Sequence, residues 1–188
     1  MTAVARTCVH DCRDLIALFN RCFAQSEVTL LVGGAPEPVY LPCGDSGCAE
    51  IHFTRDYFAS ALHEIAHWCV AGRERRQLED YGYWYAPDGR SAEQQAEFEA
   101  VEARPQALEW LFSEAAGVRF RVSADNLAQN LGPSEAFKQA VHARVLDLCT
   151  QGVSERVAAF TSALLGHYRP ELTLGGLLSP ARFARASL

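Results

Sequence analysis

The sequence has no excess of positive charge. Its 188 residues carry 17 Lys and Arg side chains against 23 Asp and Glu, which gives a formal net charge of −6. A protein that binds nucleic acid without sequence preference gains its affinity mainly by neutralising phosphates. The charge balance therefore argues against a general nucleic-acid binder, although it leaves room for a local basic patch.

Paired cysteines and long apolar runs are also missing. No two of the seven cysteines have the two-residue gap that is typical of a zinc knuckle or a thioredoxin-like site. The apolar runs are far shorter than the roughly 20 residues of a membrane-spanning helix. The first residues do not have the apolar core of a secretory signal. We therefore expect a cytoplasmic protein with reduced thiols and no association with membranes.

The apolar content is sufficient for one well-packed domain. Hydrophobic residues make up 49% of the chain and charged residues 21%, which excludes global disorder. A chain of this length favours one domain, and no repeat or linker divides it. We predict a single domain over residues 1–188.

Short β-prone runs precede longer helical patterns. Runs at 28–32, 39–41 and 49–53 predict a small antiparallel sheet near the N-terminus. Apolar residues at helical spacing predict six helices, at about 10–24, 57–71, 91–103, 106–116, 134–150 and 154–168. Thr54 or Asp56 is the expected N-cap of the second, and the fourth should end before Gly117. Ser91 and Gln94 have the spacing of a capping box. Pro105 is expected either to kink the helix that Ser91 begins or to open a new one. The predicted fold class is α+β and mostly helical.

The most informative segment is His63-Glu64-Ile65-Ala66-His67, within the predicted helix 57–71. Residues four apart lie on one face of a helix, so His63 and His67 can offer two imidazole nitrogens to one metal ion. Glu64 lies beside them and can touch a metal-bound water or hold a ligand. Two ordinary helix histidines are the alternative, but the apolar flanks favour a metal site. A helix of this kind suggests a smaller version of the core found in zincin-like metallohydrolases.

A third ligand is expected from the acidic helix that begins at Ser91. Glu102 lies among apolar residues on the face that should pack inward, where an unpaired carboxylate would be costly. A cation held by His63 and His67 would supply its partner. We therefore favour Glu102 as the third ligand, with Glu99, one turn earlier, as the alternative. The remaining glutamates of this helix fit a solvated face: Glu93 and Glu97.

Two imidazoles and one carboxylate suit more than one metal. With zinc, the set matches a helical metallopeptidase in which Glu64 is the general base. With Fe(II), it is a facial triad with open positions for dioxygen and another ligand. None of the six histidines is followed two residues later by an acid, so an oxygenase with the β-helix strand motif is excluded. Both metals remain open on these grounds.

Two other segments have structural and functional interpretations. Arg73, Arg75 and Arg76 follow the metal-binding helix, and they fit either a solvated helix end or a dock for an acidic partner surface. The aromatic block at 81–85 fits either core and loop anchoring or the lining of a channel.

Several segments together resemble the bacterial elongation factor P hydroxylase family. They are His63-Glu64-Ile65-Ala66-His67-Trp68-Cys69, Tyr81-Gly82-Tyr83-Trp84-Tyr85 with Pro87-Asp88-Gly89-Arg90, and Phe98-Glu99-Ala100-Val101-Glu102 leading into 105–112. The runs at 40–42 and 122–127 are also similar. The likeness covers roughly residues 10–170 and is more specific than the metal motif alone.

The resemblance implies a specific activity, which the spacing of the metal-binding residues alone could not indicate. It implies hydroxylation of a lysine side chain of elongation factor P after that lysine has been β-lysylated, with dioxygen and a non-haem Fe(II). The ligands would be His63, His67 and a glutamate within 98–102, for which we choose Glu102, with Glu64 close to the metal as a catalytic residue. The predicted substrate-binding residues are Tyr83, Trp84 and Arg90.

Overall fold

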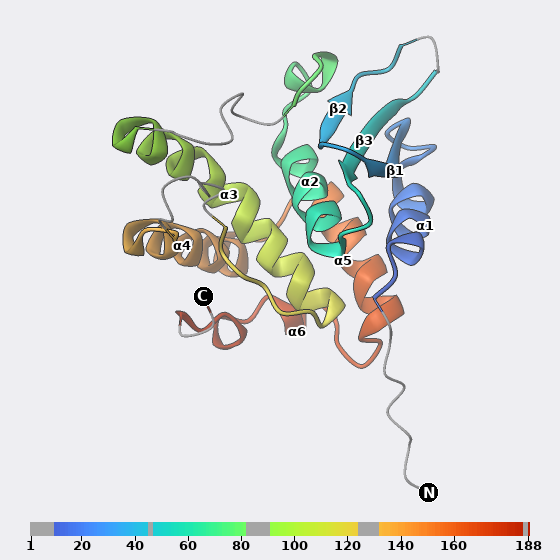
Figure 1. The fold of residues 1–188 in the computed structure, drawn as a ribbon. Coiled ribbons are helices and arrows are strands. Elements are labelled where there is room, and N and C mark those ends of the chain that lie inside the picture. Colours follow the sequence, from blue (N-terminus) through green and yellow to red (C-terminus); the bar gives the residue numbers. More distant parts are fainter. Residues whose placement is uncertain (1–9, 45–46, 82–90, 124–131, 186–187) are drawn as a thin grey trace, which may run out of the picture.

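The computed structural model describes residues 10–44, 47–81, 91–123, 132–185 and 188. Figure 1 shows a three-stranded sheet and helix α1 on one side of the molecule, with the longest helix, α3, on the other and α2 between them. The elements are α1 (Cys12–Phe23), β1 (Thr29–Ala35), β2 (Val39–Leu41), β3 (Ala49–Thr54), α2 (Phe58–Val70), the 3₁₀ turn η1 (Arg75–Gln77), α3 (Ala92–Ala116), α4 (Glu135–Gln151), α5 (Glu155–Tyr168), α6 (Leu174–Leu177) and η2 (Pro180–Arg182).

The sheet is mixed, so the prediction of an antiparallel sheet is wrong. Strand β3 lies in the centre, parallel to β1 and antiparallel to β2. Alternate residues of β3 are buried and face the helices: Ala49, Ile51 and Phe53. Strand β3 takes the central place, so both of its edges are paired.

Helix α2 matches its predicted range within one residue at each end, but its N-cap residue differs from the expectation. Tyr57 occupies its N-cap position without a side-chain hydrogen bond, where Thr54 or Asp56 was expected. At the other end, Arg156 of α5 donates hydrogen bonds to the carbonyl oxygens of Trp68 (3.0 Å) and Ala71 (2.9 Å). The guanidinium also lies 4.7 Å from the centre of the Trp68 ring. A distant cation therefore satisfies carbonyls that the helix leaves unpaired.

Helix α3 continues through Pro105, so this proline does not open a new helix. Ser91 and Gln94 form the predicted capping box, with Ser91 N donating to Gln94 Oε1 at 2.9 Å. The helix ends at Gly117, whose φ of +72° suits the left-handed end of a helix. Proline removes one helical hydrogen bond, but α3 packs on α2, α4 and α5 along its length. That packing holds both halves in one helix.

The later helices agree closely with their predicted ranges. Helices α4 and α5 each begin one residue after a serine N-cap, at Ser134 and Ser154. Among the described helices, none combines the length and apolar composition needed to cross a bilayer. The zincin-like comparison stays a prediction.

Candidate metal centre

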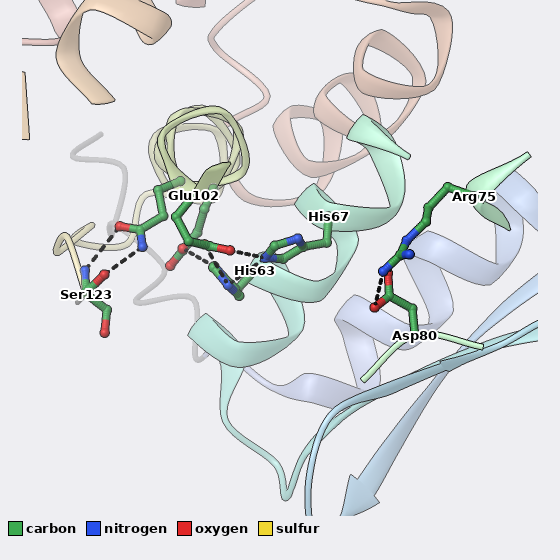
Figure 2. Close-up of polar contacts among 8 residues, drawn as sticks. His63, His67, Arg75, Asp80, Glu102 and Ser123 are labelled. Carbon is green, nitrogen blue, oxygen red and sulfur yellow. Dashed lines mark hydrogen bonds and ion pairs between the residues drawn. The ribbon is translucent and has the colours of Figure 1, made fainter. Parts of the chain in front are cut away.

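His63, His67 and Glu102 meet between α2 and α3 (Figure 2). His67 Nε2 lies 3.2 Å from Glu102 Oε1, and His63 Nε2 lies 3.5 Å from Glu102 Oε2. The two Nε2 atoms are 3.0 Å apart. One donor atom from each residue lies within 4.8 Å of the others, and no other His, Cys, Asp or Glu trio in the described ranges does so.

The surroundings of Glu102 fit a cation. Its side chain is buried, with 2% of the residue exposed, and its Oε2 atom has no hydrogen-bond partner. A buried carboxylate oxygen without a partner is costly. Two nitrogens and one carboxylate oxygen form a donor set suited to zinc or Fe(II). The residues therefore fit a divalent metal ion.

The pKa values of the centre show how strongly it attracts positive charge. Burial lowers the pKa of His63, but the hydrogen bond to Glu109 and the charges of Glu109, Glu102 and Glu64 outweigh it and raise that pKa to about 10. Burial raises the pKa of Glu102, but the hydrogen bond from His67 and the two histidine charges outweigh it, so the net shift is downward. Without a metal ion, the carboxylates around His63 therefore favour the positively charged form of that ring.

Glu109 contacts His63 at Nδ1, the ring nitrogen that faces away from Glu102. Its Oε2 lies 2.8 Å from His63 Nδ1, and its side chain is 12% exposed. A carboxylate on the far nitrogen fixes the tautomer that leaves Nε2 for a metal. Sequence reasoning did not identify Glu109. It lies two helical turns after Glu102, on the same face of α3, and that spacing could have indicated it.

Gln106 forms hydrogen bonds to Ser123, in the segment that follows α3. It lies one turn after Glu102, and only 1% of it is exposed. Its Nε2 donates to the carbonyl oxygen of Ser123 (2.7 Å), and Ser123 N donates to its Oε1 (3.1 Å). Figure 2 shows Ser123 next to Glu102, on the side away from His67. Gln106 therefore ties Ser123, in the chain after α3, to the helix that carries Glu102.

The alternative ligand, Glu99, points elsewhere. Its carboxylate accepts hydrogen bonds from Ser134 Oγ (2.6 Å) and Ser134 N (3.4 Å) at the start of α4. It links α3 to α4 and is not part of the trio. Another histidine, His52, pairs with Glu50 at 2.7 Å on β3 and is also outside the trio.

Glu64 lies next to the ligands but faces a cleft. This cleft has a volume of about 360 Å³, and Glu64 and His67 both line it. Burial raises the pKa of Glu64, although the charges of His63 and His67 partly oppose the shift. Glu64 is therefore placed toward whatever occupies the cleft.

Two of the three arginines after α2 have partners within the chain. Arg75 pairs with Asp80 (2.8 Å) and Arg76 with Glu27 (2.7 Å). These contacts favour a structural role for Arg76 over a dock for an acidic surface. Three predicted substrate-binding residues lie outside the described residues: Tyr83, Trp84 and Arg90.

Comparison with known proteins identifies the family to which this chain belongs. The model of the elongation factor P hydroxylase family matches residues 18–175. A relative from Haemophilus influenzae, described as elongation factor P lysine hydroxylase, is 51% identical over 163 residues, which cover 86% of this chain and 92% of the relative. Both matches are to hydroxylases, so neither supports a zinc peptidase. The chain belongs to the elongation factor P hydroxylase family and is an enzyme.

Proposed function

We propose that this chain hydroxylates a β-lysylated lysine side chain of elongation factor P, with dioxygen as the oxidant and Fe(II) as the metal. The name of the Haemophilus influenzae relative supports a lysine of elongation factor P as the substrate, and the family resemblance of the sequence suggests the β-lysylated form of that lysine. The observation that supports a metal is the trio of His63, His67 and Glu102, in which Glu102 Oε2 accepts no hydrogen bond. Because such a substrate is a translation factor, we place the enzyme in the cytoplasm.

The reaction replaces one C–H bond of the substrate by C–O–H. One atom of dioxygen enters that bond, and the other leaves as water. The balance requires two electrons and two protons, and an external two-electron reductant would supply the electrons. Fe(II) held by two imidazoles and a carboxylate supplies open positions at which dioxygen can be activated.

The residues of the chain bind and orient the reactants. His63, His67 and Glu102 would hold the ion, and Glu109 keeps His63 Nε2 turned toward it. The cleft beside His67 would hold the aliphatic carbon close to the ion and exclude water from it. Such positioning is a large part of what a protein contributes to cofactor chemistry. Glu64 lines the same cleft, where it can hold or deliver a proton.

Reconstitution with defined metals tests this function. The protein is loaded with Fe(II) or Zn(II) without oxygen, then mixed with β-lysylated elongation factor P, a reductant and air. Mass spectrometry should find one added oxygen atom with iron only. Unmodified elongation factor P and the Glu102→Ala variant serve as controls that should gain none. Peptide cleavage with zinc, or no added oxygen with iron, would contradict the proposal.

A further inference from the structure

The cleft beside His67 combines apolar walls with two acidic side chains. Its charged lining consists of two acids, Glu64 and Asp80, and two arginines, Arg75 and Arg76. The apolar part includes Ile51, Val70, Val101 and Pro105. In Figure 2 the Arg75–Asp80 pair lies on one side of His67 and Glu102 on the other. The cleft thus extends from the metal centre toward Asp80. Methylene groups suit its walls, and a cation suits its acids.

Asp80 is held in place by its backbone. Tyr40 of β2 donates from its N to the Asp80 carbonyl oxygen (2.7 Å), and Asp80 N donates to the Tyr40 carbonyl oxygen (3.0 Å). The Tyr40 hydroxyl also donates to the Arg76 carbonyl oxygen (2.9 Å). Three hydrogen bonds therefore tie the segment after α2 to the sheet. The position of Asp80 does not depend on its side-chain partner.

Arg75 is a partly exposed side-chain partner of Asp80. Arg75 donates from Nε to Oδ2 (2.9 Å), and its Nη2 lies 2.8 Å from Oδ1. The Arg75 side chain is 47% exposed and that of Asp80 is 26% exposed, so solvent reaches the pair and another cation can take over the contact with Asp80. Arg76 differs, because it pairs with Glu27 and lies over the Trp68 ring at 5.7 Å. Arg75 can therefore leave Asp80 without loss of a structural contact.

We propose that Asp80 binds an ammonium group at the far end of the substrate side chain and that Arg75 is the counter-ion this group displaces. The inference rests on the proposed function. β-Lysylation converts the lysine amine into a neutral amide and adds a further chain with two amines. Asp80 would then be the residue that selects the modified lysine, because an unmodified lysine carries no ammonium beyond its own ε-amine.

Binding measured without turnover tests the proposal. The Fe(II) enzyme is titrated with β-lysylated elongation factor P in the absence of oxygen, and the dissociation constant is read by calorimetry. Asp80→Asn should weaken binding by about tenfold, as expected for loss of a hydrogen bond to a charged group. Arg75→Gln is the matched control, and it should bind as tightly as the wild type or more tightly, because the competing cation is gone.

The two variants separate recognition from structure. If Asp80 served only to hold Arg75, both variants would weaken binding equally, and that result would overturn the proposal. Unchanged binding by Asp80→Asn would also overturn it. If Asp80→Asn fails to fold, Arg75→Glu replaces it: a second carboxylate at this end should strengthen binding of the cationic side chain, and weaker or unchanged binding would contradict us.

The outcomes also separate this inference from the proposed function. A wild-type enzyme that hydroxylates the modified protein, together with an Asp80→Asn variant that binds it normally, would refute only the role of Asp80. A wild-type enzyme that neither binds nor oxidises it would refute both.

Discussion

The Oε2 atom of Glu109 lies 2.8 Å from Nδ1 of His63, on the opposite side of the ring from Glu102. The imidazole is thus held between two carboxylates of one helix, α3. One faces the nitrogen available to a metal, and the other faces the nitrogen that should carry a proton.

This relationship predicts that Glu109 affects metal affinity without being a ligand. Glu109→Ala should weaken metal binding by about 10- to 100-fold, as loss of an outer hydrogen-bond partner commonly does. Glu109→Gln keeps an acceptor and should fall between Ala and the wild type. Competition with a chromophoric chelator gives the affinities. Wild-type affinity in Glu109→Ala would show that the contact has no effect on the metal.

The third ligand can be tested by a matched pair on the same helix. Glu102→Ala should lose stoichiometric metal, because Glu102 is the carboxylate that completes the trio with both histidines in the described part of the chain. Glu99→Ala should retain it, because Glu99 contacts Ser134 instead. Elemental analysis after dialysis measures bound metal. The opposite result in the two variants would make Glu99 the ligand.

Metal binding should release a proton at mildly alkaline pH. The Glu109 contact helps raise the pKa of His63 to about 10 in the metal-free protein, so this ring is protonated at pH 8 and must lose its proton to bind a metal. Calorimetry in buffers of different ionisation enthalpy should count about one proton from His63 at pH 8, and affinity should fall about tenfold for each unit of pH lowered. A histidine with the ordinary pKa of about 6.5 would release almost none. Absence of proton release at pH 8 would therefore exclude the raised pKa of His63.

Arg156 should stabilise the end of the helix that carries both histidines. Arg156→Met removes the donors to the carbonyls of Trp68 and Ala71 and should cost about 1–3 kcal/mol of unfolding free energy. Arg144→Met is the control: this side chain is 60% exposed and makes one long contact with Asp147, so its loss should cost under about 0.5 kcal/mol. Urea unfolding measures both. Equal losses of unfolding free energy in the two variants would indicate that the hydrogen bonds of Arg156 to the end of α2 contribute nothing.

The thiols should differ strongly in reactivity. Burial raises the pKa of Cys69 to about 12, and only 6% of the residue is exposed. Cys43 is exposed. Because the thiolate is the reactive form, iodoacetamide should modify Cys43 in the native protein and Cys69 only after unfolding. Peptide mass mapping would reveal the order, and rapid labelling of Cys69 in the native protein would contradict its burial.

Local features of this protein could be predicted from the sequence because they depend on neighbouring residues. A spacing of four places His63 and His67 on one face of any helix, so their approach needs no knowledge of the fold. The capping box at Ser91 and the helix end at Gly117 also follow from a few adjacent residues. The family resemblance was likewise present in the sequence, and the comparisons confirm it.

The tertiary structure decided which distant residues join these local features. Glu99 and Glu102 lie one turn apart on α3, and only the packing of α3 against α2 turns Glu102 toward the histidines and Glu99 toward Ser134. The direction of β1 relative to β3, and the continuity of α3 through Pro105, depend on contacts between elements, not on local preference. Asp80 reaches the cleft because Tyr40 pairs with its backbone. Spacing determines neighbours within a helix, whereas burial of apolar faces determines which helices and strands meet.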